Sequence, residues 1–192
     1  MCIRDRQGAV VPLLTLLRCA VDPAALSDED TAATLMASPL GGADPMALRR
    51  LRRELRRLEL AAGGDRPSGA LLVDALRGDD PLTALDQRTA RPARAIAGLL
   101  AVAAETAAAG RPAEEVLWRV WQRTGLARRW AEMAGWGGPA GTQADRDLDA
   151  VVALFDAAAR YADRLPGADG GAAGVRGFCE YVAEQRLSLI HI

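Results

Sequence analysis

The chain has 192 residues, half of them hydrophobic, with 24 basic and 25 acidic side chains and a formal net charge of −1. This length fits one domain, or one domain and a small part of another, and the apolar content is enough for a packed core. The balanced charge excludes a globally basic nucleic-acid-binding protein, so any such binding must come from a local patch.

The two ends look foreign to the fold. Residues 1–6 (MCIRDR) and 187–192 (LSLIHI) resemble a translated sequencing adapter and its reverse complement read in frame. The interior has one isoleucine and no histidine, whereas the two hexapeptides together hold three isoleucines and the only histidine. We expect both to be adapter-derived scars, with the natural polypeptide continuing beyond Gln7 and Arg186.

Residue usage suggests a source and a compartment. The chain has no lysine and no asparagine, which is typical of a GC-rich genome, and we expect an actinobacterial source. Cys19 and Cys179 lie far apart without CxxC spacing, so they are expected to be buried free thiols in a reducing compartment. No signal peptide is visible, and the longest apolar run, residues 95–104, is too short to span a membrane. These features predict a cytoplasmic protein without a membrane partner.

Helical periodicity begins near Ala9 and lasts to Val21. Ser27 is expected to cap a short second helix, with Asp30 as the far end of an imperfect capping box. A turn over residues 38–42 then leads into the most distinctive stretch of the chain.

That stretch is an arginine-rich helix. Asp44 suits its N-cap and Pro45 its first position, and a Gly-Gly pair at residues 63–64 closes it. One face is apolar and comprises Leu48, Leu51, Leu55, Leu58 and Ala62. The other side carries Arg49, Arg50, Arg52, Arg53, Arg56 and Arg57. This face is either an ordinary solvated surface or a phosphate-binding one, because guanidinium groups bind phosphate bidentately.

The remaining segments also have helical patterns. We expect helices over residues 71–76, 92–109, 112–124, 126–133, 144–165 and around 178–182, with a glycine-rich loop over 135–141. No period-2 strand and no internal repeat is evident in the sequence. The predicted fold class is all-α, an irregular multi-helix bundle of about eight to ten helices.

The sequence predicts no catalytic, cofactor-binding or metal-binding residue. A phosphate loop of the GxxxxGK[ST] type needs a lysine, and a histidine triad or histidine metal site needs an interior histidine. Asp145, Asp147 and Asp149 resemble the start of a calcium loop, but Ala150 stands where that loop requires glycine.

The tryptophans allow two interpretations. Trp118, Trp121 and Trp130 have helical spacing, which favours core positions over base-stacking positions. Trp136 lies in the glycine-rich stretch, where we expect it to be exposed and available to a partner.

The order of segments resembles a known family. An apolar helix ending in Asp-Pro, a short helix, a Ser-Pro-Leu-Gly-Gly turn and Leu-Arg-x-Leu-Arg-Arg resemble the start of the 2B insertion of UvrD/Rep-type superfamily 1 DNA helicases. The chain looks most like the actinobacterial helicase–nuclease branch (AdnA/AdnB-like, with RecB-like architecture), and residues 140–164 resemble a helix late in the same insertion. This implies that residues 7–37 end a motor-domain helix and enter the insertion, and that residues 38–186 form a helical accessory domain.

The resemblance also implies a DNA contact. Leu40, Gly41 and Gly42 match the position where the family's Gly-x-Gly element touches the duplex backbone, although the wider family has Gly-Ile-Gly there. A glycine turn can bring backbone N–H groups close to phosphates. From the helical wheel we infer that a second group adds a salt-dependent, sequence-independent hold: Arg49, Arg52, Arg53 and Arg56.

Two functions are therefore considered. The first is an accessory duplex-DNA-contacting domain of an ATP-dependent DNA helicase active in unwinding, repair and recombination. Its partners would be DNA, the remaining motor domains and a second helicase–nuclease subunit, and ATP and Mg²⁺ would bind to the parent protein outside this window. The alternative is a non-enzymatic helical protein-interaction module, with an exposed apolar patch around Trp130 and Trp136 and no basic cluster near the glycine turn.

Overall fold

A computed structural model describes residues 7–78, 82–164 and 170–188. Within those ranges the chain forms nine α-helices, the 3-10 helix η2 and no strand, which confirms the predicted all-α class and helix number. In chain order these are α1 (Gln7–Val21), η2 (Pro23–Leu26), α2 (Glu29–Ala37), α3 (Pro45–Ala61), α4 (Ser68–Leu76), α5 (Gln87–Ala108), α6 (Ala113–Thr124), α7 (Leu126–Trp136), α8 (Gly138–Arg164) and α9 (Gly171–Ser188).

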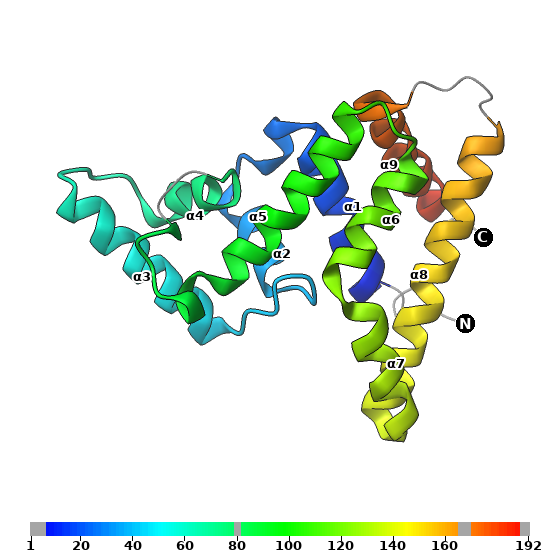
Figure 1. The fold of residues 1–192 in the computed structure, drawn as a ribbon, viewed down its shortest axis with the longest axis horizontal. Helices are drawn as coiled ribbons and strands as arrows, with labels where there is room; N and C mark the ends of the chain where they lie inside the picture. Colours follow the sequence, from blue (N-terminus) through cyan, green and yellow to red (C-terminus); the bar gives the residue numbers. More distant parts are fainter. Residues whose placement is uncertain (1–6, 79–81, 165–169, 189–192) are drawn as a thin grey trace.

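The helices are arranged along one long axis (Figure 1). Helices α3 and α4 lie at one end, α8 runs along the other end, and α1 and α5 pack together between them. Buried apolar side chains from all of these helices join in one cluster that runs through the molecule. In the three described ranges, none of the helices combines the length and the apolarity that crossing a bilayer requires.

Two predicted helix starts are wrong, and capping explains both. Helix α2 is capped by Asp28 rather than Ser27, because the Asp28 carboxylate accepts a hydrogen bond from the Thr31 N–H at 2.7 Å. Helix α5 begins at Gln87, before the predicted start at Pro92, because the carboxylate of Asp86 accepts from two N–H groups of the first turn. The predicted cap of α3 is confirmed, since Asp44 accepts from the third helical N–H at 2.7 Å.

The predicted loop over residues 135–141 is almost entirely helical. Helix α7 ends at Trp136 and α8 begins at Gly138, so Gly137 alone joins them. Gly137 and Gly138 have φ of 70° and 69°, which glycine adopts without the steric cost of a side chain. Gly141 permits close packing instead, because a Cβ atom there would lie 2.7 Å from the carbonyl oxygen of Met133. These glycines therefore build a tight helical hairpin.

The two interior cysteines are free thiols, as predicted. Cys19 is buried and Cys179 is partly buried. Burial raises the pKa of both thiols to about 11, so very little reactive thiolate exists at neutral pH.

Replacing Asp147 with Asn should stabilise the protein at neutral pH. Asp147 is half-buried on α8, and this burial raises the pKa of its carboxyl although the Gln143 side chain donates a hydrogen bond to it at 3.1 Å. A raised pKa means that the folded state binds the proton more tightly, so stability falls as the pH rises above the ordinary value of 3.8 and the full cost is present above the folded-state pKa. Below its ordinary value of 3.8 the side chain is protonated in both states and that cost disappears.

Thermal unfolding of the Asp147→Asn variant and the original protein at pH 3 and pH 7 tests this. The variant should gain melting temperature at pH 7 and little at pH 3. Asp156→Asn, an exposed site on the same helix, is the control and should show no comparable gain at pH 7. An equal gain at both pH values for Asp147→Asn would contradict the assignment.

Candidate nucleic-acid interface

The glycine turn between α2 and α3 offers no open backbone amide. Four successive N–H groups donate inside the turn: Leu40 to the Ser38 hydroxyl (3.2 Å), Gly41 and Gly42 to the Ser38 carbonyl (3.1 and 2.8 Å), and Ala43 to the Met36 carbonyl (2.9 Å). Leu40 and Gly41 are also buried. The expectation that these amides are available to phosphates is therefore wrong, because each one is already hydrogen-bonded within the protein.

The two glycines shape the chain instead of binding a ligand. A Cβ atom at Gly41 would overlap the carbonyl group of Met36, so only glycine lets the turn close against the end of α2. Gly42 has φ of 65°, a left-handed conformation that favours glycine. The turn thus directs the chain into α3.

Helix α3 is fixed by both its apolar face and its far end. Leu51 and Leu55 are buried against the neighbouring helices. After α3, the Arg66 guanidinium joins Glu59 of α3 at 2.8 Å to Asp74 of α4 at 2.7 Å. Hydrogen bonds from Arg66 lower the pKa of the Glu59 carboxyl, so the pair stays ionised at neutral pH. The outward face of α3 is thereby held in a fixed orientation.

Two of the four arginines that were predicted to contact DNA form ion pairs within the protein. Arg52 forms an ion pair with Glu29 of α2 at 2.5 Å. Arg56 forms an ion pair with Asp65 and donates a hydrogen bond to the Arg66 carbonyl at 2.7 Å. Only about one third of each of these two arginine side chains is exposed. Arg52 and Arg56 therefore fasten α3 to its neighbours, and the inference that places them on an open face needs correction.

The outward side of α3 carries a different set of four arginines, which we name the open arginine face: Arg49, Arg50, Arg53 and Arg57. All four are exposed. The Arg49 guanidinium donates a hydrogen bond to the Met46 sulfur at 3.9 Å, and within the described residues neither Arg49 nor Arg50 has an ion pair. Arg53 and Arg57 share Glu54, at 3.9 and 2.8 Å. Four guanidinium groups thus face solvent. Glu54 pairs with two of them, and the Asp86 carboxyl, whose pKa is lowered mainly by hydrogen bonds from Thr89, also interacts electrostatically with Arg50.

Sequence reasoning placed all six arginines on one side of α3, but two of the four that it selected, Arg52 and Arg56, are paired within the protein. The signal that separates them is tertiary, since Glu29 and Asp65 reach Arg52 and Arg56 from neighbouring segments. Arg49 and Arg53 are common to both sets.

The tryptophan side chains differ in their exposure to solvent. Trp121 and Trp130 are buried with ring centroids 5.7 Å apart, as the core interpretation predicts. Trp118 is 47% exposed, so the core prediction is wrong for it. Trp136 is 80% exposed, as predicted. Of the apolar patch expected around Trp130 and Trp136, only Trp136 is exposed, and arginines of α3 follow closely after the glycine turn.

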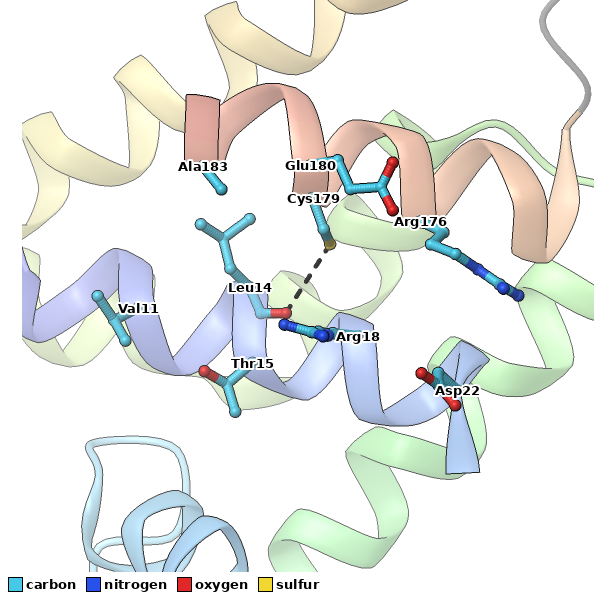
Figure 2. A pocket seen from close by; sticks show the side chains of 9 residues that line it. All are labelled: Val11, Leu14, Thr15, Arg18, Asp22, Arg176, Cys179, Glu180 and Ala183. Carbon is cyan, nitrogen blue, oxygen red and sulfur yellow. Dashed lines mark hydrogen bonds between the residues drawn. The ribbon is translucent and has the colours of Figure 1, made fainter. Parts of the chain in front are cut away.

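A pocket of about 310 Å³ between α1 and α9 is a second candidate site. Figure 2 shows Arg18, Asp22, Arg176 and Glu180 around it, and the Cys179 thiol donates to the Leu14 carbonyl at 3.9 Å. Two cations and two anions line the same space, so the pocket does not favour a ligand of either charge. Across the part of the chain that the structure describes, no three His, Cys, Asp or Glu side chains come together as a metal site.

The open arginine face is thus the stronger candidate, because its charges are predominantly positive and point outward. Neither the protein-family models nor the curated proteins include a match to this chain.

Proposed function

We propose that this chain is an accessory helical domain that holds the phosphate backbone of duplex DNA on the open arginine face. The observation that carries the proposal is the fixed, outward row of four arginines, of which only Arg53 and Arg57 have an ion pair within the described residues. Guanidinium groups bind phosphate oxygens in a bidentate fork, and such contacts position a protein on DNA without reading its sequence. The backbone amides of the glycine turn take no part.

The parent protein in this proposal is an ATP-dependent DNA helicase. That part rests on the resemblance of residues 10–186 to the 2B-type insertion of UvrD/Rep-like enzymes. ATP and Mg²⁺ would be bound by motor domains outside this chain. This chain would orient the duplex while the motor domains unwind it. The remaining motor domains and a second helicase–nuclease subunit would be the protein partners, in the cytoplasm. The isolated chain should accordingly bind DNA without hydrolysing ATP.

Replacing Arg49, Arg50, Arg53 and Arg57 with Gln should weaken duplex binding and flatten its salt dependence. Each phosphate contact contributes about 0.9 to the slope of log affinity against log salt, so the loss of four contacts should lower the slope by about 3 to 4. Fluorescence anisotropy with a labelled 25-base-pair duplex, over a series of NaCl concentrations, measures both quantities.

The matched control removes the same charge elsewhere, by changing four exposed arginines of α5, α7 and α9 to Gln: Arg91, Arg128, Arg129 and Arg176. This control should keep most of the slope. A second comparison, Arg52→Gln with Arg56→Gln, should lower stability and leave the slope nearly unchanged, because both side chains are engaged within the protein. Equal losses from the open-face variant and the matched control would overturn the proposal.

A further inference from the structure

A second exposed surface lies on α6 and α8, at the end of the molecule opposite α3 (Figure 1). Trp118 of α6 packs edge-on against Phe155 of α8, with ring centroids 5.8 Å apart. Val152, one turn from Phe155 on the same helix, is 60% exposed, and Trp118 is 47% exposed. Large apolar side chains at adjacent exposed positions favour contact with another molecule.

A row of carboxylates borders this apolar patch. Four exposed aspartates and one exposed arginine of α8 fall within about 80° of Val152 on the helical wheel: Asp145, Asp149, Asp156, Asp163 and Arg160. Within the described ranges, none of the four has an ion pair with a basic side chain. Asp145 and Asp149 are spaced i,i+4, so their like charges repel each other, and a bound cation would relieve that repulsion.

We infer that this acidic–aromatic surface, comprising Trp118, Val152, Phe155 and the four aspartates, docks an arginine- or lysine-rich amphipathic helix of a partner protein. Charge complementarity selects the occupant, because four carboxylates against one guanidinium give the acid row a net negative charge, which attracts a basic helix and repels DNA. Trp118 supplies the aromatic anchor that typically dominates such interfaces.

The shape of the surface also favours a helical occupant. The acid row extends over residues 145–163 of one helix, or roughly 27 Å at 1.5 Å per residue. A helix laid alongside can present apolar and basic residues at i, i+3, i+4 and i+7, which is the usual way in which amphipathic helices are recognised. Because the surface lies away from the open arginine face, docking does not compete with the proposed DNA contact.

The test uses a fluorescein-labelled synthetic peptide of residues 45–61, which is an arginine-rich amphipathic sequence, as the probe. We expect it to bind the full chain and to lose affinity as NaCl rises. Val152→Arg adds a cation at the centre of the surface and should weaken binding at least tenfold. The mutation site is exposed and arginine is a good helix former, so folding should be retained.

The control is Ala70→Arg, which adds the same charge at an exposed position of α4 and should leave peptide binding unchanged. A second variant, Asp149→Asn with Asp156→Asn, should reduce the salt dependence of binding. No peptide binding, or equal binding by all variants, would overturn the inference. Self-association of the chain that Val152→Arg abolishes, measured by sedimentation velocity, would also overturn it, because a second copy would then be the occupant.

Duplex binding by Val152→Arg keeps the two hypotheses distinguishable. The DNA proposal predicts that Gln substitution of the open arginine face lowers duplex affinity by the same factor in Val152→Arg as in the original protein. If the peptide does not bind the acidic–aromatic surface, the test of DNA binding is unaffected. If the open arginine face does not bind DNA, the test of peptide binding is likewise unaffected.

Discussion

Leu51→Ala should lower the free energy of unfolding by about 3 kcal/mol, because it removes a fully buried side chain and leaves a cavity that the neighbouring helices fill only in part. Leu51 lies at the centre of the apolar face that seats α3. Urea denaturation followed by circular dichroism measures the change, with the m-value as a check on two-state behaviour.

Leu60→Ala is the matched control on the same helix. Leu60 is exposed, so its truncation should change the unfolding free energy by less than about 0.5 kcal/mol. Similar losses from both substitutions would show that α3 does not pack through the Leu51 face. The open arginine face would then have no fixed orientation.

Gly41→Ala should destabilise the protein by about 3 kcal/mol, the upper end of the usual cost of overpacking. The new Cβ atom would overlap the Met36 carbonyl, and backbone atoms cannot rotate away as a side chain can. The hydrogen bond from Ala43 to that same carbonyl would be strained as well. Thermal and urea unfolding measure the loss.

Gly42→Ala separates packing from backbone conformation. This position has open space for a Cβ atom but a φ of 65°, so alanine should cost only about 1 kcal/mol, the penalty of the left-handed conformation. At temperatures where they remain folded, both glycine variants should bind duplex DNA with an unchanged salt slope. A lowered slope for either would restore the turn as a phosphate contact.

Features encoded within a few residues could be predicted from the sequence. The cap at Asp44, the Leu51 face of α3 and the all-α class all follow from spacing and capping rules that neighbouring residues satisfy. The start of α2 could not be predicted because Ser27 and Asp28 are both good capping residues, and the sequence alone does not rank their geometry.

Features that depend on distant segments could not be predicted. Whether Arg52 and Arg56 are open or paired depends on where Glu29 and Asp65 lie after folding. The glycine turn has the same sequence whether its amides are open or closed, and here the carbonyl groups of Ser38 and Met36 close it. Periodicity identified Trp118 as helical, but it could not show that this side of α6 stays partly open beside α8.

The single-residue junction between α7 and α8 has a mechanical consequence. Gly141 lies so close to the Met133 carbonyl that the backbones of the two helices are in contact. Only Gly137 connects them. A force applied to α8, such as the pull of a molecule bound there, would pass directly into α7. Helices α7 and α8 would therefore move together as one rigid body.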